Sequence, residues 1–532
     1  MPFSKPCGLS LALCVAIGFV ASGSVNATDT TGPEVTSAVQ HDTLHSLRGV
    51  MPRPDDFSKN SHSHPAHPLP FIDGPGNPTD SAVQGSVTGS FAPALGAGFD
   101  GVGQGFSGPQ GTFTVNSAPP DTNGAVGATQ YVQIVNSAFA VFDKSTKAVS
   151  YGPVTTNTLW AGFGGPCEAD NDGDATVVYD KAAGRWIIAQ FAVTAAPYYQ
   201  CVAVSATSDA TGAYYRYAFP YGSVFPDYPK MGVWPDAYYE TFNMFSGNTF
   251  SGAKLCAYDR NAMLSGAAAT QQCFQLSSSY GGVLPADLDG ATAPPAGSPN
   301  YLMNFGASSL NLWKFHVDWA NTANTTLTGP VSIPVASFAA ACGGGTCIPQ
   351  SGVSQKLDSL ADRLMFRLAY RNFGDHESLV VSHSVKVGTT HKNPYTGVRW
   401  YEVRSPGSTP VVYQQSTFSP DTSYRWMGSV AMDKVGDMAL GYSVSSSALH
   451  PAIRYTGRLS SDTPSTMQAE SSIIEGLGSQ SGNNLSRWGD YSAMTVDPVD
   501  DCTFWYTTEY LKSTGSFNWN TRIASFKFPT CQ

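Results

Sequence analysis

The chain has 532 residues and a formal net charge of −10, and charged residues make up only 13% of it. It contains no basic stripe, so nucleic acid is excluded as an expected partner. The 53 glycines, 36 prolines and 12% aromatic residues are typical of a β-rich, turn-rich protein rather than a helical one.

The first 27 residues have the pattern of a secretory signal peptide. Lys5 provides the positive start, Leu11–Val20 forms a short apolar run, and Val25–Ala27 offers a small-residue cleavage site. A membrane anchor is the alternative, but the run is too short to span a bilayer comfortably. We therefore predict that residues 1–27 are removed, that the protein is secreted to the periplasm or the extracellular space, and that no segment spans a membrane.

Residues 28–114 are rich in Gly, Pro, Ser and His and lack hydrophobic periodicity. They are predicted to be a linker or pro-region, with a strand or two laid on the main domain. The tract that holds His62, His64 and His67 could bind a transition metal, but a solvated, flexible tract is favoured.

Eight of the ten cysteines follow the predicted cleavage site. An even number in an exported chain indicates disulfides, and the absence of a CxxC pair argues against zinc or redox sites. Pairing between neighbours is the simplest arrangement, although sequence alone does not prove it. It joins Cys167 to Cys201, Cys256 to Cys273, Cys342 to Cys347 and Cys502 to Cys531.

Residues 115–532 alternate short apolar strands with turns. The clearest repeat is Arg487–Met494, which echoes Arg425–Met432. Seven two-strand units follow one plan, and each has room for a four-stranded sheet. Their first strands begin at Asp121, Asp172, Asp227, Tyr301, Arg363, Arg425 and Arg487.

This repetition predicts an all-β fold, a seven-bladed β-propeller of four-stranded antiparallel sheets, with a six-bladed propeller as the alternative. A β-helix or a pair of sandwiches fits less well, because the repeat is too long for β-helix rungs and seven related units do not suit sandwiches. The innermost strands of a propeller line a central channel, and their starts meet on one face. We therefore expect one mouth to gather Asp121, Asn123, Asp172, Asp174, Asp227, Tyr228, Lys230, Arg363, Arg425, Arg487, Asp490 and Tyr491.

Four phrases in this region resemble signatures of a largely uncharacterised family of secreted bacterial β-propeller proteins. They are Pro119–Gly124, Phe225–Lys230, Leu368–Phe373 and Arg487–Tyr491. The resemblance covers about residues 115–531 and implies the fold, but it carries no activity to transfer. Ser208–Tyr214 resembles a degenerate Asp-box turn, which makes the layout distantly similar to the sialidase-like propeller superfamily.

Arginines at the expected mouth point to substrate binding, because guanidinium groups grip carboxylates in a bidentate manner and would suit an acidic sugar. The candidate binding residues are Arg363, Arg371, Arg425, Arg487, Lys230, Asp227 and Asn123. The structural alternative is that these side chains bond to neighbouring turns and lock blade to blade.

Two carboxylates, Asp490 and Asp174, could act as acid and base or as acid and nucleophile across a sugar ring. Tyr491 or Tyr228 could serve as the nucleophile instead. Asp490 is a better functional candidate than its neighbour Trp488. Trp488 repeats as Trp426 and is therefore expected to build the blade, whereas Asp490 aligns with Gly428 and does not repeat.

The run Asp170–Asp174 imitates the start of a calcium loop, with Asp170, Asp172 and Asp174 as candidate ligands. Its twelfth position is Lys181 rather than Glu, so an EF-hand fails, and an Asp-rich turn is the alternative. Beyond this possible structural calcium, no cofactor is expected.

Together these features predict a secreted, monomeric carbohydrate-active protein, a glycoside hydrolase or polysaccharide lyase whose partner is a polysaccharide or glycoconjugate at the central mouth. A non-catalytic extracellular propeller for glycan binding, adhesion or protein interaction is the alternative, because a fold does not determine function.

Overall fold

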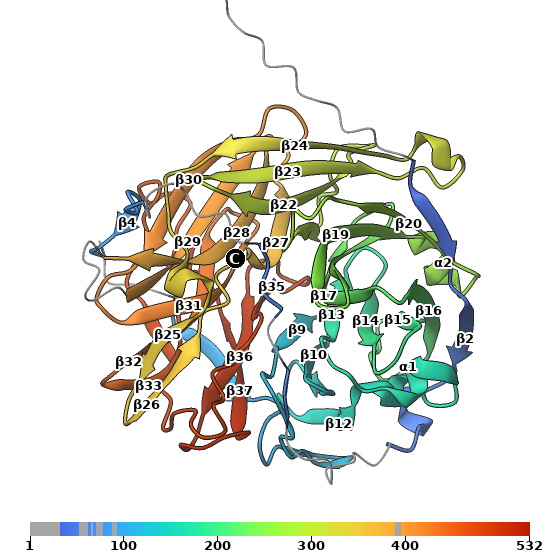
Figure 1. The fold of residues 1–532 in the computed structure, drawn as a ribbon, viewed down its shortest axis with the longest axis horizontal. Coiled ribbons are helices and arrows are strands. Elements are labelled where there is room, and N and C mark those ends of the chain that lie inside the picture. Colours follow the sequence, from blue (N-terminus) through green and yellow to red (C-terminus); the bar gives the residue numbers. More distant parts are fainter. Residues whose placement is uncertain (1–31, 53–61, 65–66, 71–77, 88–92, 389–394) are drawn as a thin grey trace, which may run out of the picture. The chain divides into compact units, whose positions relative to one another are not determined.

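The computed structural model describes residues 32–52, 62–64, 67–70, 78–87, 93–388 and 395–532 (Figure 1). The predicted signal peptide, residues 1–27, lies outside these ranges. From Gly32 onward the chain forms one unit, built almost entirely of β-strands, so the all-β prediction is confirmed. The helices of the described residues are short: α1 (Gly165–Ala169), α2 (Arg260–Ser265), η1 (Leu47–Gly49), η2 (Thr156–Trp160), η3 (Thr322–Asn324) and η4 (Ala341–Gly344). Within the described ranges, no helix is long and apolar enough to cross a bilayer.

The first three sheets follow one another along the chain, and their strands pair antiparallel. The first sheet contains β9 (Asn123–Val126), β10 (Gln130–Val135), β11 (Ala138–Asp143) and β12 (Val149–Thr155). The second contains β13 (Thr176–Asp180), β14 (Arg185–Ala192), β15 (Tyr198–Ser205) and β16 (Tyr214–Gly222). The third contains β17 (Phe225–Val233), β18 (Tyr238–Ser246), β19 (Thr249–Tyr258) and β20 (Thr270–Gln275).

A larger sheet joins two further groups of four strands. Its first group is β21 (Leu284–Asp289), β22 (Asn300–Gly306), β23 (Ser309–His316) and β24 (Thr326–Pro334). Its second group is β27 (Met365–Asn372), β28 (Glu377–Val387), β29 (Tyr395–Arg404) and β30 (Val411–Phe418). The two groups meet where β21 pairs parallel with β27, with Ala286 opposite Leu368.

The last two sheets complete the array. One contains β31 (Tyr424–Met432), β32 (Met438–Ser446), β33 (Leu449–Arg458) and β34 (Ser471–Ile474). The other contains β35 (Ala493–Val496), β36 (Phe504–Leu511) and β37 (Trp519–Phe526), with β5 (Leu95–Asp100) as its fourth strand. Two small sheets have two strands each: β6 (Ser107–Gly108) with β7 (Gly111–Thr112), and β25 (Thr346–Gln350) with β26 (Val353–Asp358).

The segment predicted as a linker or pro-region supplies strands to this array. The strands are β1 (Glu34–Ser37) beside β20, β2 (Gln40–Leu44) beside β16, β4 (Val83–Gln84) beside β30, and β5 beside β37. A fifth strand, β3 (His62–Ser63), pairs parallel with β8 (Ser117–Ala118). The N-terminal segment therefore fastens the outer edges of several sheets.

The first strand of each group forms part of a closed ring. β9, β13, β17, β21, β27, β31 and β35 each contact the next, and β35 returns to contact β9. Apolar side chains fill the space between neighbouring sheets; one cluster unites Ile134 of the first sheet with Trp186 and Ile188 of the second. The ring therefore brings together the starts of strands that are far apart in the sequence.

In the described part of the chain, four disulfides join the neighbouring cysteines as predicted: Cys167–Cys201, Cys256–Cys273, Cys342–Cys347 and Cys502–Cys531. The prediction of the first strands is wrong in two units. The fourth begins with β21 rather than at Tyr301, which lies in the second strand, β22. In the seventh, strand pairing starts at Ala493, because Arg487–Ser492 forms a loop that enters the ring before β35.

Candidate functional site at the starts of the first strands

Left-handed backbone conformations recur where the first strands start. Asp121 (φ 46°) and Asp174 (φ 45°) lie two residues before the starts of β9 and β13, while Tyr228 (φ 58°) and Met427 (φ 54°) lie within β17 and β31. Asp tolerates this region, but it is a rare conformation for bulky residues such as Tyr and Met. Strain of roughly 1–3 kcal/mol at each such residue is often found at functional sites, where the surrounding structure holds it in place.

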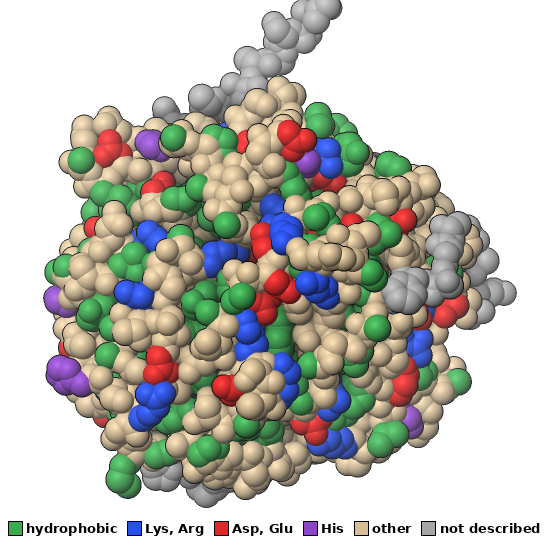
Figure 2. Space-filling view, turned by 180° about the vertical axis from the view of Figure 1, so that it is seen from behind, with side chains coloured by type: hydrophobic (Ala, Val, Ile, Leu, Met, Phe, Trp, Pro, Cys, Tyr) green, Lys and Arg blue, Asp and Glu red, His purple; other side chains and the backbone are tan. Residues whose placement is uncertain are grey.

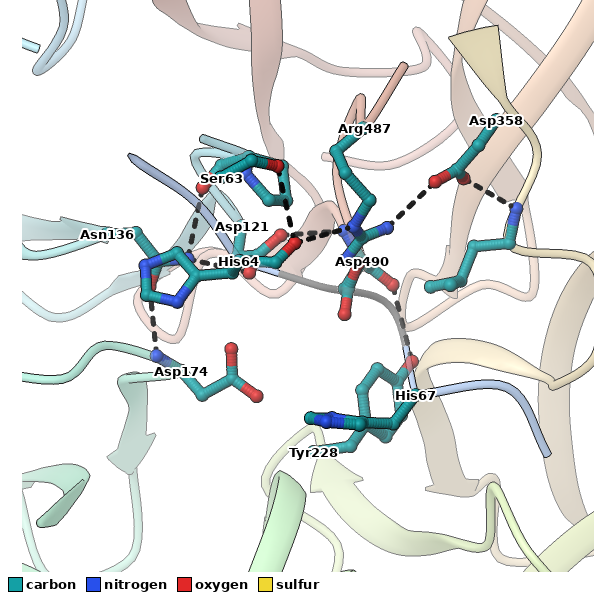
Figure 3. Close-up of polar contacts among 12 residues, drawn as sticks. Ser63, His64, His67, Asp121, Asn136, Asp174, Tyr228, Asp358, Arg487 and Asp490 are labelled. Atoms are coloured by element: carbon teal, nitrogen blue, oxygen red, sulfur yellow. Dashed lines mark hydrogen bonds and ion pairs between the residues drawn. The ribbon is translucent and has the colours of Figure 1, made fainter. Parts of the chain in front are cut away.

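Asn136 links two of the carboxylate residues (Figure 3). Its Nδ2 donates to Asp121 Oδ2 at 2.7 Å, and its Oδ1 accepts from the backbone N–H of Asp174 at 2.9 Å. The other carboxylate oxygen of Asp121 accepts from the backbone N–H of Asp490 at 2.8 Å. One buried network thus joins the segments that lead into three sheets.

Arg487 holds the third carboxylate of the cluster. Its guanidinium pairs with Asp490 through Nη2 and with Asp358 through Nη1, the latter at 2.9 Å. The phrase that repeats most clearly in the sequence therefore contributes an Arg–Asp pair within itself. Asp358 comes from the end of β26, outside the repeating units.

Lys230 lies buried in the middle of the site. Its ammonium nitrogen is 3.6 Å from the ring centroid of Tyr228 and 3.8 Å from that of Tyr491, and it donates to the carbonyl of Pro229 at 2.8 Å. These cation–π contacts offset part of the cost of burying the charge. Arg363 lies 4.5 Å from the Tyr228 ring centroid, so Tyr228 contacts two cations.

The buried carboxyl groups titrate over different ranges. Burial raises the pKa of Asp174 to about 6, even though Lys230 acts to lower it. Burial and the nearby Asp490 raise the pKa of Asp121 well above its usual value. Burial acts on Asp490 too, but the guanidinium groups of Arg487 and Arg363 outweigh it and lower the pKa. One cluster therefore holds a carboxyl that is a proton donor near pH 6 and another that stays ionised.

Burial also shifts the pKa values of the basic and phenolic groups. It lowers the pKa of Lys230 to about 8, against the opposing effect of Asp174 and Asp490. It raises the pKa of Tyr228 and of Tyr491 well above 10. Both phenols are therefore neutral at any ordinary pH.

Residues 62–64 and 67–70, which we call the cover segment, lie against this cluster (Figure 3). The carbonyl of His64 accepts from Arg487 Nε at 3.2 Å, and His67 Nδ1 is 3.5 Å from Asp227 Oδ2. Arg363 donates to the carbonyl of His67 at 3.1 Å. The expectation of a solvated histidine tract is thus wrong for His64 and His67, because their own backbone carbonyls accept hydrogen bonds from Arg487 and Arg363, and the His67 ring contacts the Asp227 carboxylate.

The four arginines do not form a single cluster. Arg363 and Arg487 lie at the mouth, whereas Arg371 lies at the other end of β27 and pairs with Asp501 at 2.7 Å. Arg425 pairs with Asp421 at 2.9 Å and with Glu470 at 2.8 Å, within the sheet of β31–β34. Their partners are carboxylates of neighbouring turns. Arg371 and Arg425 therefore have the structural role of bonding to these turns.

Of the remaining candidates, Asn123 joins first strands, because its Oδ1 accepts from the backbone N–H of Val177 at 3.3 Å. The Asp172 carboxylate accepts from the backbone N–H of Val193 at 2.6 Å and from the Thr194 hydroxyl at 2.8 Å, away from Asp174. Within the described ranges, no three His, Cys, Asp or Glu side chains form a group that could hold a metal ion. The calcium site stays a prediction from sequence.

Three residues of the site were missed in the sequence: Asn136, Asp358 and Glu509. Burial raises the pKa of Glu509 to about 8, and Thr508 donates to its carboxyl at 3.0 Å. Asn136 follows β10 directly, so its place after the second strand of a unit was the available signal. Asp358 and Glu509 occupy positions that the repeat alignment did not mark.

No family model and no curated protein matches the chain. Among solved structures, the N-terminal domain of Nup159 aligns with 84% of this chain and 100% of its own, at a TM-score of 0.35 and 8% identity. An exo-β-1,3-galactanase from Clostridium thermocellum aligns with 67% of this chain and 81% of its own, at a TM-score of 0.30 and 11% identity. A structure from the GH130 family of mannoside phosphorylases, which contains glycoside hydrolases, aligns with 84% of this chain and 97% of its own, at a TM-score of 0.28 and 8% identity.

Proposed function

We propose that residues 115–532 form a seven-bladed β-propeller of the secreted bacterial type that the sequence resembles. The seven successive groups of strands support this blade count, as does the ring in which β35 returns to β9. The last blade would be closed by β5, a strand from the N-terminal segment, beside β37. The protein would act as a secreted monomer.

We further propose that the protein is a glycoside hydrolase with its active site at the mouth where the first strands start. The observation that carries this proposal is the convergence of Asp121, Asp174 and Asp490, from the segments that lead into three sheets, around the buried Lys230. Asp174, neutral below about pH 6, would donate a proton to the glycosidic oxygen. Asp490, which Arg487 keeps ionised, would act as nucleophile or as base toward water.

Two features favour one nucleophile and one class of glycan. The pKa values of Tyr228 and Tyr491, well above 10, disfavour a phenolate nucleophile, so Asp490 is the better candidate. Arg363 and Arg487 already pair with Asp362, Asp358 and Asp490. They therefore have little capacity left for the carboxylate of an acidic sugar, which favours a neutral glycan and a hydrolase over a lyase.

One observation favours the second candidate, a non-catalytic propeller that binds glycans or proteins. Asp121 and Asp490 are buried and already hold partners, and the cover segment lies over them. Such a network can lock a ring of strands without any chemistry.

The deciding experiment incubates the mature protein with a panel of neutral and acidic polysaccharides and measures reducing ends. We expect release from a neutral glycan by the wild type, with losses of at least about 100-fold for Asp174→Asn and Asp490→Asn. Asp375→Asn, at an exposed turn, is the matched control. Binding of a glycan without cleavage would favour the second candidate. Equal activity of all variants would show that the site is elsewhere.

A further inference from the structure

A second hollow lies at the opposite ends of the first strands. It is a cavity of about 320 Å³ lined by the ends of β13, β17 and β21 and by the loop after β35. Figure 2 views the molecule from the side opposite to Figure 1, and basic and acidic side chains gather near the middle of this face. The volume lies at the lower end of the range for small-molecule sites, roughly 300–1,000 Å³.

The walls of this cavity are largely apolar. Its apolar lining residues include Trp234, Pro235, Leu288 and Pro498. A smaller hollow of about 20 Å³ shares Leu288, Pro498 and Lys181 with it and continues inward along the strands. An apolar chamber thus leads to a narrow polar end.

Every charged group at the rim already has an opposite charge beside it. Lys181 pairs with Asp289 at 3.1 Å, and Arg260 pairs with Asp180 at 2.7 Å. Asp501, also on the rim, pairs with Arg371. The cavity therefore offers no unpaired charge to a charged ligand.

Two polar atoms at the narrow end have no hydrogen-bond partner within the described part of the chain. Both Lys181 and Arg367 contact Oδ1 of Asp289, whereas its Oδ2 is buried and unpartnered. The side chain of Asp289 is only 4% exposed. The hydroxyl of Thr495, which lines the same hollow, is buried and unpartnered as well.

Buried polar atoms in proteins nearly always have partners, so these two atoms call for a partner from outside the chain, a water molecule or a ligand hydroxyl. Arg367 and Lys181 outweigh the effect of burial and lower the pKa of Asp289 to about 2. Its Oδ2 is therefore a charge-bearing acceptor that is satisfied by an O–H or N–H donor.

We propose that this cavity binds a small, neutral, polyhydroxylated ring, such as a single sugar residue. The ring would lie in the larger cavity with its apolar face on the walls around Trp234 and Leu288. One of its hydroxyl groups would enter the smaller hollow of about 20 Å³, which has room for a single water-sized group, donate to Asp289 and exchange a hydrogen bond with Thr495. Ring hydroxyls carry no charge, which suits a rim whose charges are all paired. This site is separate from the acidic cluster, and the proposal does not depend on the activity proposed there.

The test uses saturation-transfer NMR and calorimetry on the mature protein with methyl α-glucoside, methyl α-mannoside, methyl β-galactoside and myo-inositol. Glucuronate and glucosamine serve as the charged comparison probes. Ala291→Trp would fill the cavity from its exposed rim, and Ala296→Trp places the same bulk on the same loop outside the lining. Thr495→Val replaces the unpartnered hydroxyl with a methyl group and keeps the branched side-chain shape.

We expect at least one neutral probe to bind, with affinity at least 10-fold weaker in Ala291→Trp and unchanged in Ala296→Trp. Thr495→Val should weaken binding by roughly 3- to 10-fold without lowering thermal stability, because the hydroxyl has no partner in the chain. Failure of every neutral probe to bind would overturn the proposal. So would tighter binding of a charged probe, or binding that Ala291→Trp leaves intact.

Discussion

At the scale of single residues, the contrast between Asp174 and Asp490 matters most. Both are buried in one cluster, yet the pKa of Asp174 is raised to about 6 and that of Asp490 is lowered. The difference follows from position: Arg487 contacts Asp490 directly, whereas Asp174 lies beyond that contact, and burial dominates its titration. Two carboxyl groups whose pKa values differ in this way suit acid–base chemistry on a glycosidic bond.

This contrast predicts the pH dependence of the proposed hydrolysis. Asp174 must be protonated, so kcat/KM should fall as the pH rises through about 6. Asp490 must be ionised, so activity should fall only at strongly acidic pH, below the usual value for an Asp. Rates measured between pH 3 and pH 8 should therefore peak on the acidic side, and Asp174→Asn should lose the basic limb. A rate that still rises above pH 7 would contradict this assignment.

Glu509 allows a prediction about stability. Its pKa in the folded protein, raised to about 8 by burial, lies above the value of about 4.5 expected when unfolded. The folded state therefore binds the proton more tightly, so this stability is present below about pH 4.5 and is lost as the pH rises toward 8. Gln does not titrate, so Glu509→Gln should stabilise the protein at pH 8 by roughly 1–3 kcal/mol relative to wild type.

The measurement is thermal unfolding at pH 4 and at pH 8. Glu475→Gln, which replaces a partly exposed carboxylate, is the control. The gain of Glu509→Gln at pH 8 should shrink or vanish at pH 4. Equal shifts at both pH values would show that Glu509 is not neutral in the folded protein.

At the scale of elements, the repeat in the sequence was enough to locate most first strands but not β21. Its sequence, Leu284–Asp289, contains Pro285, and only its first two residues pair with β22. The other four pair in parallel with β27, some eighty residues later in the chain. A strand held by such a distant partner lacks the local alternation that marks a hairpin, so a local pattern could not reveal it.

The same reasoning separates the predicted from the unpredicted parts of the site. Asp121, Asp174, Tyr228 and Lys230 occupy equivalent places near the starts of first strands, and the repeat alignment marked them. The His64 and His67 contacts come from a segment without periodicity, and the Asp358 contact comes from β26 between two units. Their position depends on tertiary packing, which the spacing of repeats does not encode.

The cover segment gives a prediction about access to the mouth. Leu69 is buried, and its backbone N–H donates to Asp362 Oδ2 at 2.9 Å. Leu69→Asp places a charge in this apolar position beside an acidic group, which should detach the segment. We expect faster hydrogen exchange in β8 and β9, and a several-fold higher kcat/KM on large glycans if the segment restricts access.

Val39→Asp is the control, because Val39 is exposed and belongs to the same N-terminal region. It should change neither exchange at the mouth nor activity. Lower activity of Leu69→Asp with unchanged exchange in β8 would mean that the segment supports the site rather than restricting it.

At the scale of the whole described unit, the ring depends on one closure. The last sheet is completed by β5 from the N-terminal segment, whose Phe99 lies opposite Ile523 of β37. The Cys502–Cys531 disulfide ties the turn between β35 and β36 to the end of the chain, across 29 residues. The Cys342–Cys347 disulfide closes a loop of only 5 residues outside the four-stranded groups.

These two disulfides should differ in their contribution to stability. In the chain-entropy model, the longer loop constrains the unfolded chain more, by roughly 3.6 kcal/mol against about 2 kcal/mol for the short one. The double variant Cys502→Ser/Cys531→Ser also frees the edge where the ring closes. Its loss of stability should therefore exceed that of Cys342→Ser/Cys347→Ser by more than the difference between these two entropy terms. Thermal unfolding of both double-serine variants tests the prediction: the 502/531 variant should melt at the lower temperature. Equal melting temperatures would mean that pairing between β5 and β37 closes the ring without help from the disulfide.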